Sequence, residues 1–124
     1  MNQLDLTLAR AEGVAGMERA AAHAERMSPG LSEAMYRFLT VFARNCERGD
    51  RFTAEVVTLL YAKDPCLVQP PDARSWGSIF VRAINSGILA IADFNGVRSL
   101  GHGTKGAKRY RSLVAGKRAT EVLP

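Results

Sequence analysis

The chain has few of the residues that build metal centres or disulfide frameworks. Its 124 residues include only two cysteines, Cys46 and Cys66, and two histidines, His23 and His102. Neither pair shows the ligand spacing of a zinc site, and the cysteines carry no disulfide signature. We therefore expect two reduced thiols, no metal and no bound cofactor.

Long apolar runs are also missing. A membrane-spanning helix needs about 18 to 20 consecutive apolar residues, and no segment approaches that length. The N-terminus lacks the basic segment followed by an apolar one that marks a secretory signal. Because 47% of the residues are hydrophobic, the chain can still bury the core of one small domain. These features predict a cytoplasmic domain with no membrane partner.

Acidic residues are scarce in the C-terminal part of the chain. Residues 1–72 hold eight Lys/Arg and ten Asp/Glu, a net charge of −2, whereas residues 73–124 hold nine and two, a net charge of +7. Clustered cations bind a phosphate backbone favourably because they release its condensed counterions. The alternative is a solvated basic tail that only aids solubility. The asymmetry favours a nucleic-acid partner.

The same scarcity of acids argues against catalysis. Paired-carboxylate chemistry needs two acids at one site, and residues 73–124 offer only Asp93 and Glu121. The segment GHGTKG lacks the GxxxxGK[ST] pattern of a nucleotide-binding loop and is predicted to join two strands. Ser99 and His102 belong to no recognisable hydrolase motif. We therefore expect that the protein is not an enzyme.

The N-terminal part of the chain is predicted to be helical. Leu8–Met27 is rich in alanine, glutamate and arginine, but Gly13 and Gly16 each weaken a helix by about 1 kcal/mol, which suggests a break near Gly16. Ser28 followed by Pro29 fits the N-cap and first turn of a second helix. Its apolar stripe recurs at helical spacing and consists of Leu31, Met35, Phe38, Leu39, Phe42 and Cys46.

A third, short helix is predicted to begin after Thr53. Thr53 has the residue type of an N-cap, with Phe52 before it and Val57 four residues later in the arrangement of a hydrophobic staple. The segment Asp64–Pro71 contains three prolines and is predicted to be a linker. The buried side of the short helix is expected to consist of Val56, Val57, Leu60 and Tyr61.

The stretch from Asp72 to Ala92 predicts an amphipathic helix, a glycine stop and a strand. Asp72 suits the N-cap, and Gly87 suits the left-handed position after the helix. The apolar residues fall at i, i+3, i+4, i+7 and i+8, which places them on one helical face. They are Trp76, Ile79, Phe80, Ala83 and Ile84.

After this helix the sequence pattern changes from a helical period to that of strands. Ile88–Phe94 and Lys108–Val114 are rich in apolar and β-branched residues, and Asn95 and Gly96 form a turn signal. The glycine-rich segment SLGHGTKGAK, residues 99–108, lies between the two strands. The C-terminal part therefore predicts a β-hairpin with a long basic tip.

This order of elements is that of a winged helix, in which the hairpin is the wing and the last helix lies in the major groove. We expect an α+β, mostly helical fold with about four helices and a C-terminal two-stranded β-hairpin. The expected domains are a helical arm at residues 1–27, a winged-helix domain at residues 28–114 and a flexible basic tail at residues 115–124. The linker at residues 64–71 is longer than the three to four residues of a tight helix-turn-helix.

Three short motifs carry a resemblance to known proteins. They are FTAEVV at residues 52–57, PPDARSWGSIFVRAINSGIL at residues 70–89, and a segment with glycine, histidine and lysine that ends in RYRS. With this spacing, residues 31–113 resemble small winged-helix-like proteins encoded by bacteriophages and prophages. The resemblance implies a DNA-binding or replication-associated accessory protein in the cytoplasm of a bacterial host.

The predicted DNA-binding residues form two groups. Polar residues of the amphipathic helix would face a groove, where arginine can pair with guanine and asparagine with adenine. Residues of the wing and its strands would contact phosphate or the minor groove and supply affinity. Because strand side chains alternate, not every wing cation can reach one surface. The helix group is Arg74, Ser75, Ser78, Arg82 and Asn85, and the wing group is Arg98, His102, Lys105, Lys108, Arg109 and Arg111.

Two functions remain open from the sequence. The first is a double-stranded DNA-binding protein that acts in transcription control or DNA replication of a phage or prophage. The second is a winged-helix module that binds a host replication, recombination or transcription protein through the N-terminal helix or the surface near Trp76, since a fold does not fix function. A homodimer is a further open arrangement, although no sustained heptad requires it.

Overall fold

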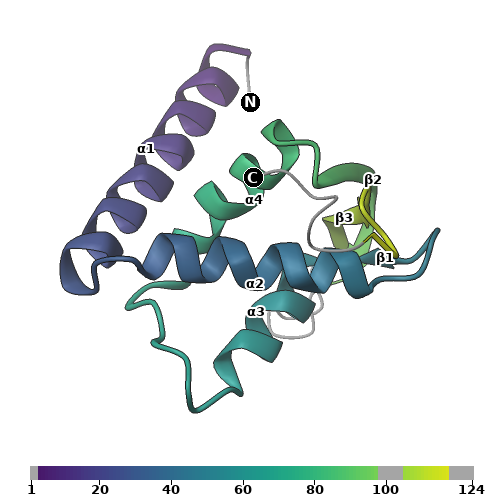
Figure 1. Cartoon of the computed structure of the whole chain (residues 1–124). Coiled ribbons are helices and arrows are strands. Elements are labelled where there is room, and N and C mark those ends of the chain that lie inside the picture. Colours follow the sequence, from purple (N-terminus) through teal and green to yellow (C-terminus); the bar gives the residue numbers. More distant parts are fainter. Residues whose placement is uncertain (1–2, 98–104, 118–124) are drawn as a thin grey trace.

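Figure 1 shows the computed structural model of the chain, in which helices dominate and a small sheet lies at one end. The structure describes residues 3–97 and 105–117. Within these residues the chain forms four α-helices, one short 3-10 helix and a three-stranded antiparallel sheet. The predicted α+β, mostly helical class is therefore confirmed, but the predicted number of strands is wrong. The elements are α1 (Gln3–Met27), α2 (Leu31–Asn45), β1 (Arg51–Phe52), α3 (Ala54–Ala62), η1 (Ala73–Ser75), α4 (Trp76–Asn85), β2 (Leu89–Val97) and β3 (Lys105–Ser112).

α1 is one uninterrupted helix, so the predicted break near Gly16 is wrong. The helix packs against η1 and α4, and its Ala20 and Ala24 are buried. Tertiary packing of this kind supplies most of the stability of helices in proteins. It offsets the cost of about 1 kcal/mol that a glycine imposes on an isolated helix. The expected N-terminal arm therefore lies against the rest of the fold.

α2 begins later than predicted, because Ser28 does not form its N-cap. Gly30 occupies that position with a φ of 85°. The carboxylate of Glu25 in α1 accepts hydrogen bonds from the backbone N–H groups of Gly30 at 2.7 Å and Ser32 at 3.1 Å. These bonds stabilise the charged form and lower the pKa of Glu25. A side chain of one helix thus caps the next helix.

The hydrophobic core lies between α2, α3, α4 and the inner face of the sheet. The stripes predicted for α2 and α4 are buried or packed against it, and aromatic rings join them. Tyr61 meets Trp76 edge-on at 5.1 Å between ring centroids, and Phe80 lies 4.9 Å from Tyr110. Aromatic pairs of this geometry contribute about 0.5 to 1.5 kcal/mol beyond the area that they bury. The face of α4 predicted as apolar therefore anchors the fold.

α3 begins after Thr53 as predicted, but its buried side is narrower than expected. Thr53 occupies the N-cap without a side-chain hydrogen bond. Val57 and Tyr61 are fully buried, whereas Val56 and Leu60 are 42% and 43% exposed. The prediction that Val56 and Leu60 are buried is wrong, because only the stripe at i and i+4 meets the core.

β1 is the strand that the sequence pattern did not reveal. It pairs antiparallel with β3, with Arg51 opposite Arg111 and Phe52 opposite Tyr110. β3 therefore lies in the centre of the sheet, in the order β1-β3-β2. A strand of two residues shows no periodicity, and its partner is distant in the chain. Local patterns could not predict this pairing.

β2 continues through Asn95 and Gly96, so the turn predicted there is wrong. Gly96 is paired with Ala107 of β3. A Cβ on Gly96 would lie 2.8 Å from the Ala107 carbonyl oxygen and 2.7 Å from the Thr53 methyl carbon. This glycine permits a close approach of chains rather than a turn. Of the predicted loop at residues 99–108, residues 99–104 lie outside the described residues. The prediction of a loop at residues 105–107 is wrong, because β3 begins at Lys105.

Candidate nucleic-acid interface

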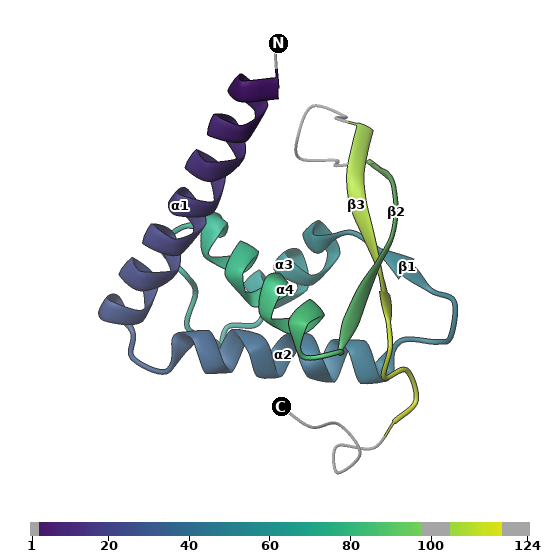
Figure 2. The same cartoon turned by 90° about the horizontal axis from the view of Figure 1, so that it is seen from above.

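The N-terminal end of α4 lies beneath α1. Figure 2 shows α1 and the β2–β3 hairpin on opposite sides of α4. Gly77 in the first turn of α4 contacts Met17 so closely that a Cβ there would overlap the methionine side chain. A Cβ on Gly16 of α1 would lie 3.9 Å from Nη1 of Arg74 in η1, which is an ordinary van der Waals contact. Because the first residues of a recognition helix usually contact base edges, α1 covers part of the surface that such a helix would use.

The neutral residues of the predicted reading face differ in exposure. Ser75 is only 2% exposed, and its hydroxyl donates a hydrogen bond to the Asp72 carbonyl oxygen at 2.6 Å. Ser78 is half-buried and donates to the Ser75 carbonyl oxygen at 3.2 Å. Both hydroxyls therefore satisfy local backbone acceptors. Asn85, in the last turn of α4, is exposed.

Both arginines of this segment are paired with acids. Arg74 bonds Asp72 at 2.8 Å, and these bonds lower the pKa of Asp72 and raise that of Arg74. Arg82 bonds Glu33 of α2 at 2.7 Å, and its guanidinium carbon lies 3.8 Å from the centre of the Tyr36 ring. Exposed ion pairs of this kind contribute about 0 to 1 kcal/mol. A phosphate group could therefore compete for these arginines, although each has a partner within the chain.

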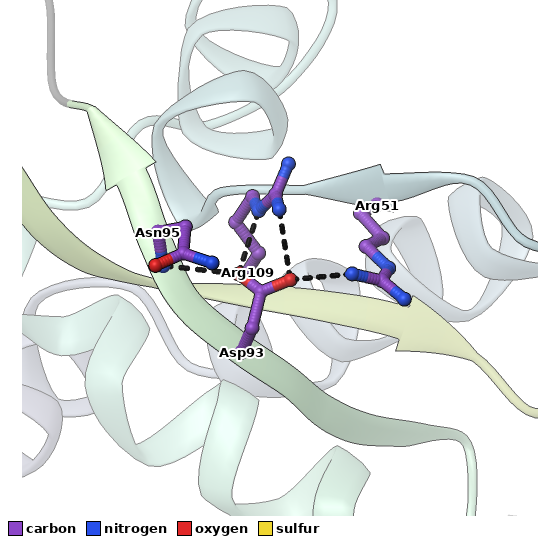
Figure 3. Close-up of polar contacts among 4 residues, drawn as sticks. All are labelled: Arg51, Asp93, Asn95 and Arg109. Carbon is purple, nitrogen blue, oxygen red and sulfur yellow. Dashed lines mark hydrogen bonds and ion pairs between the residues drawn. The ribbon is translucent and has the colours of Figure 1, made fainter.

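Arg109 is held within the sheet by Asp93, as Figure 3 shows. Its Nε and Nη2 donate to the two carboxylate oxygens at 2.7 and 2.8 Å. Arg51 bonds the same carboxylate at 2.7 Å, and the backbone N–H of Asn95 donates to it at 3.0 Å. The Arg109 hydrogen bonds, followed by that of Asn95, hold the pKa of Asp93 well below its usual range. A register shift after Ile91 places this carboxylate opposite Arg109.

The remaining described cations of the basic half have no acid partner. Lys108, Arg111 and Lys117 are exposed, and they form no ion pair within the described residues. All three lie on β3 or in the five residues after it. Lys108 and Arg111 point to opposite faces of β3, as strand alternation predicts. The predicted residues Arg98 and His102, and the side chain of Lys105, lie outside the described part.

An apolar groove of about 610 Å³ separates α1 from the hairpin. Residues of α1, α3, η1, α4, β2 and β3 line it, with Lys108 among them. Val81 of α4 and Phe94 of β2 are 48% and 57% exposed there. Apolar concave surfaces with a few polar groups are typical binding sites. No sequence motif marks this groove because its residues come from six separate elements.

Other site types find no support in the described part of the chain. None of its helices is long and apolar enough to cross a membrane. None of its His, Cys, Asp and Glu side chains gather in a group of three suited to a metal ion. Cys46 and Cys66 are free thiols as predicted, and burial, followed by the charge of Asp50, raises the pKa of Cys46.

Comparisons with known proteins add no assignment. No protein-family model, curated protein or solved structure matches the chain. The resemblance to phage and prophage winged-helix proteins stays a prediction. Within the described residues, the unpaired cations around β3 and the apolar groove are two candidate binding surfaces.

Proposed function

We propose that the protein is a winged-helix protein of a phage or prophage that binds double-stranded DNA through its β2–β3 hairpin and acts in transcription control or DNA replication. The element order from α2 to β3, with β3 central in the sheet, is compatible with a winged helix. One observation carries the proposal: Lys108, Arg111 and Lys117, the cations of the basic half without acid partners in the described residues, gather on or just after β3.

The proposed roles of the hairpin and α4 differ. Phosphate contacts position a protein on DNA, whereas contacts with base edges specify the sequence. The hairpin supplies phosphate contacts through Lys108 and Arg111 and, in the part of the hairpin outside the described residues, through the predicted cations. α4 positions the hairpin and contributes few DNA contacts, since α1 covers the first turn of α4 and Arg82 is paired with Glu33. We expect affinity for DNA with weak sequence preference.

Fluorescence anisotropy with a labelled duplex, measured at several salt concentrations from about 50 to about 200 mM, tests this proposal. The variant Lys108→Ala/Arg111→Ala removes two proposed phosphate contacts, so the log–log salt slope of binding should fall by about 1.8. The matched control Arg26→Ala/Lys63→Ala removes the same charge from exposed positions at the ends of α1 and α3. Its slope should stay near that of the wild type. Absence of duplex binding by the wild type, or equal losses in both variants, would contradict the proposal.

The groove supports a second function, that of a module that binds a host replication, recombination or transcription protein. The specific observation is that Val81 and Phe94 leave an exposed apolar surface between α1 and the hairpin. An apolar segment of a partner could bury both side chains, and an acidic residue of that segment could form an ion pair with Lys108.

The two functions can be separated with Val81→Ser/Phe94→Ser, which removes the apolar side chains without changing the charge near Lys108. A protein-binding module should retain its host partner after nuclease treatment of the lysate. This variant should lose that partner, while its circular dichroism and the salt slope of its duplex binding stay unchanged. Capture that disappears with nuclease would instead attribute the association to nucleic acid.

A further inference from the structure

A basic hollow lies at the end of β3 that is distant along the strand from the hairpin tip. It has a volume of about 390 Å³. The turn between α2 and β1, the end of β3 and the turn after β3 line it. Its charged residues are Arg48, Arg111 and Lys117, and all three are exposed. Among the described residues that line the hollow, there is no acidic side chain.

Hydrogen bonds hold the backbone segments that carry these cations. In the turn before β1, the Asp50 N–H donates to the Glu47 carbonyl oxygen at 3.2 Å, and the Asp50 carboxylate accepts the Glu47 N–H at 3.1 Å. In the turn after β3, the Gly116 N–H donates to the Arg44 carbonyl oxygen at 2.8 Å. Arg111 lies in the central strand, between β1 and β2. The backbone that carries each of the three cations is therefore held in the fold.

Glu47, Asp50 and Asp93 do not line this hollow. The Asp50 carboxylate bonds the backbone of its own turn, and Asp93 is bound by Arg51 and Arg109. Within the described residues, Glu47 forms no ion pair. The positive charges of Arg48, Arg111 and Lys117 line one hollow and repel one another. Binding of an anion between them would therefore be favoured. Guanidinium groups bind phosphate with a planar fork of donors, and a lysine adds a compact charge.

We propose that the hollow formed by Arg48, Arg111 and Lys117 binds a phosphate group. The phosphate belongs either to a nucleic-acid backbone or to a free phosphate compound. In the first case the site extends the proposed DNA interface to a part of the sheet that Lys108 does not face, and it rests on the proposed function. In the second case the site is independent of DNA.

Titration of the ¹⁵N-labelled full chain with inorganic phosphate, against sodium chloride at equal ionic strength, tests the site directly. The backbone amide signals of Gly49, Ser112 and Gly116 should move with phosphate in the wild type. They should not move in Arg48→Gln/Lys117→Gln. The control Arg26→Gln/Lys63→Gln, with the same loss of charge, should respond like the wild type.

A duplex-DNA arm at about 100 mM salt identifies the source of the phosphate. If the site holds the DNA backbone, Arg48→Gln/Lys117→Gln should weaken binding by about tenfold or more, since each lost contact removes about 0.9 from the salt slope. Unchanged duplex affinity with a lost phosphate response assigns the site to a free phosphate compound. If the wild type binds no duplex, the proposed function fails while the phosphate titration still decides this inference. The inference is overturned when Arg48→Gln/Lys117→Gln matches the control variant in both titrations.

Discussion

The cations around α4 and those exposed along β3 all carry one positive charge, but they have different neighbours. The arginines of η1 and α4 bond Asp72 and Glu33, whereas Lys108 and Arg111 have no acid partner in the described residues. From the sequence, both sets are predicted to lie on exposed faces and to contact DNA. A partner that binds Arg74 or Arg82 must therefore displace an acid of the chain, whereas no ion pair within the described residues holds Lys108 or Arg111.

A second difference between the two regions lies in packing. α4 is enclosed, with its apolar face in the core and its first turn beneath α1. The hairpin carries exposed residues such as Phe94 and Val97 on β2. Substitutions on the buried face of α4 should therefore lower the free energy of unfolding. Substitutions of exposed hairpin residues should instead change the binding of DNA or of a protein partner.

The largest expected effect is on the α4 core. Phe80 is 3% exposed and packs on Tyr110, so Phe80→Ala should lower the free energy of unfolding by about 3 to 5 kcal/mol. Phe94→Ala is the matched control, because Phe94 is 57% exposed, and it should cost less than about 0.5 kcal/mol. Urea denaturation measures both values. Equal losses would remove the distinction between an enclosed helix and an exposed hairpin face.

The close approach of chains at Gly96 should give the next largest effect. Gly96→Ala would press a methyl group against the Ala107 carbonyl oxygen, and overpacking of this kind costs about 1 to 3 kcal/mol. Gly77→Ala provides the comparison, because the flexible Met17 side chain is its obstacle and alanine favours a helix over glycine by about 1 kcal/mol. Hydrogen exchange should report looser α1 amides in Gly77→Ala, with stability near that of the wild type. A Gly96→Ala variant as stable as the wild type would contradict the geometry of β2.

The Asp93 network should make stability depend on acid pH. Its pKa is lower in the folded protein than its ordinary value of 3.8, so its contribution is present above that value and is lost as pH falls through the folded pKa. Thermal unfolding between about pH 7 and pH 2 should show a smaller acid-induced decrease in Asp93→Asn than in the wild type. Identical pH profiles would show that the bonds between Asp93 and Arg109 do not contribute to the pH dependence of stability.

The smallest effect should separate the paired and unpaired arginines. Arg82→Ala removes an exposed ion pair and a contact with the Tyr36 ring, which together contribute about 1 kcal/mol. Arg111→Ala should change stability by less than about 0.5 kcal/mol, because Arg111 has no acid partner in the described residues. A double-mutant cycle with Glu33→Ala isolates the coupling of Arg82 with Glu33. Absence of coupling would mean that this pair does not hold Arg82 in solution.

The fold could be predicted from the sequence where the determinants are local. The apolar stripes of α2 and α4 and the left-handed Gly87 follow from residues a few positions apart, and the structure confirms them. Asp72 does act as a cap, but it caps the 3-10 helix η1, and the N-cap of α4 itself is Ser75. The short strand β1 and the exposed side of α3 could not be predicted, since both depend on partners elsewhere in the chain. The same holds for the candidate site. The burial of Ser75 and the pairing of Arg82 with Glu33 could not be predicted, because both follow from the packing of distant segments.

The sequence by itself determined the helical spacing, the proline linker and the concentration of positive charge after residue 72, because spacing, residue type and composition act over short distances. Only the tertiary structure decided the ion pairs between residues that are distant in the sequence. It joined Arg82 to Glu33 across 49 positions and Arg51 to Asp93 across 42. It also laid α1 over the start of α4 and gathered Arg48 with Arg111 and Lys117. Contacts between distant segments form only when the chain is folded, so no local pattern encodes them.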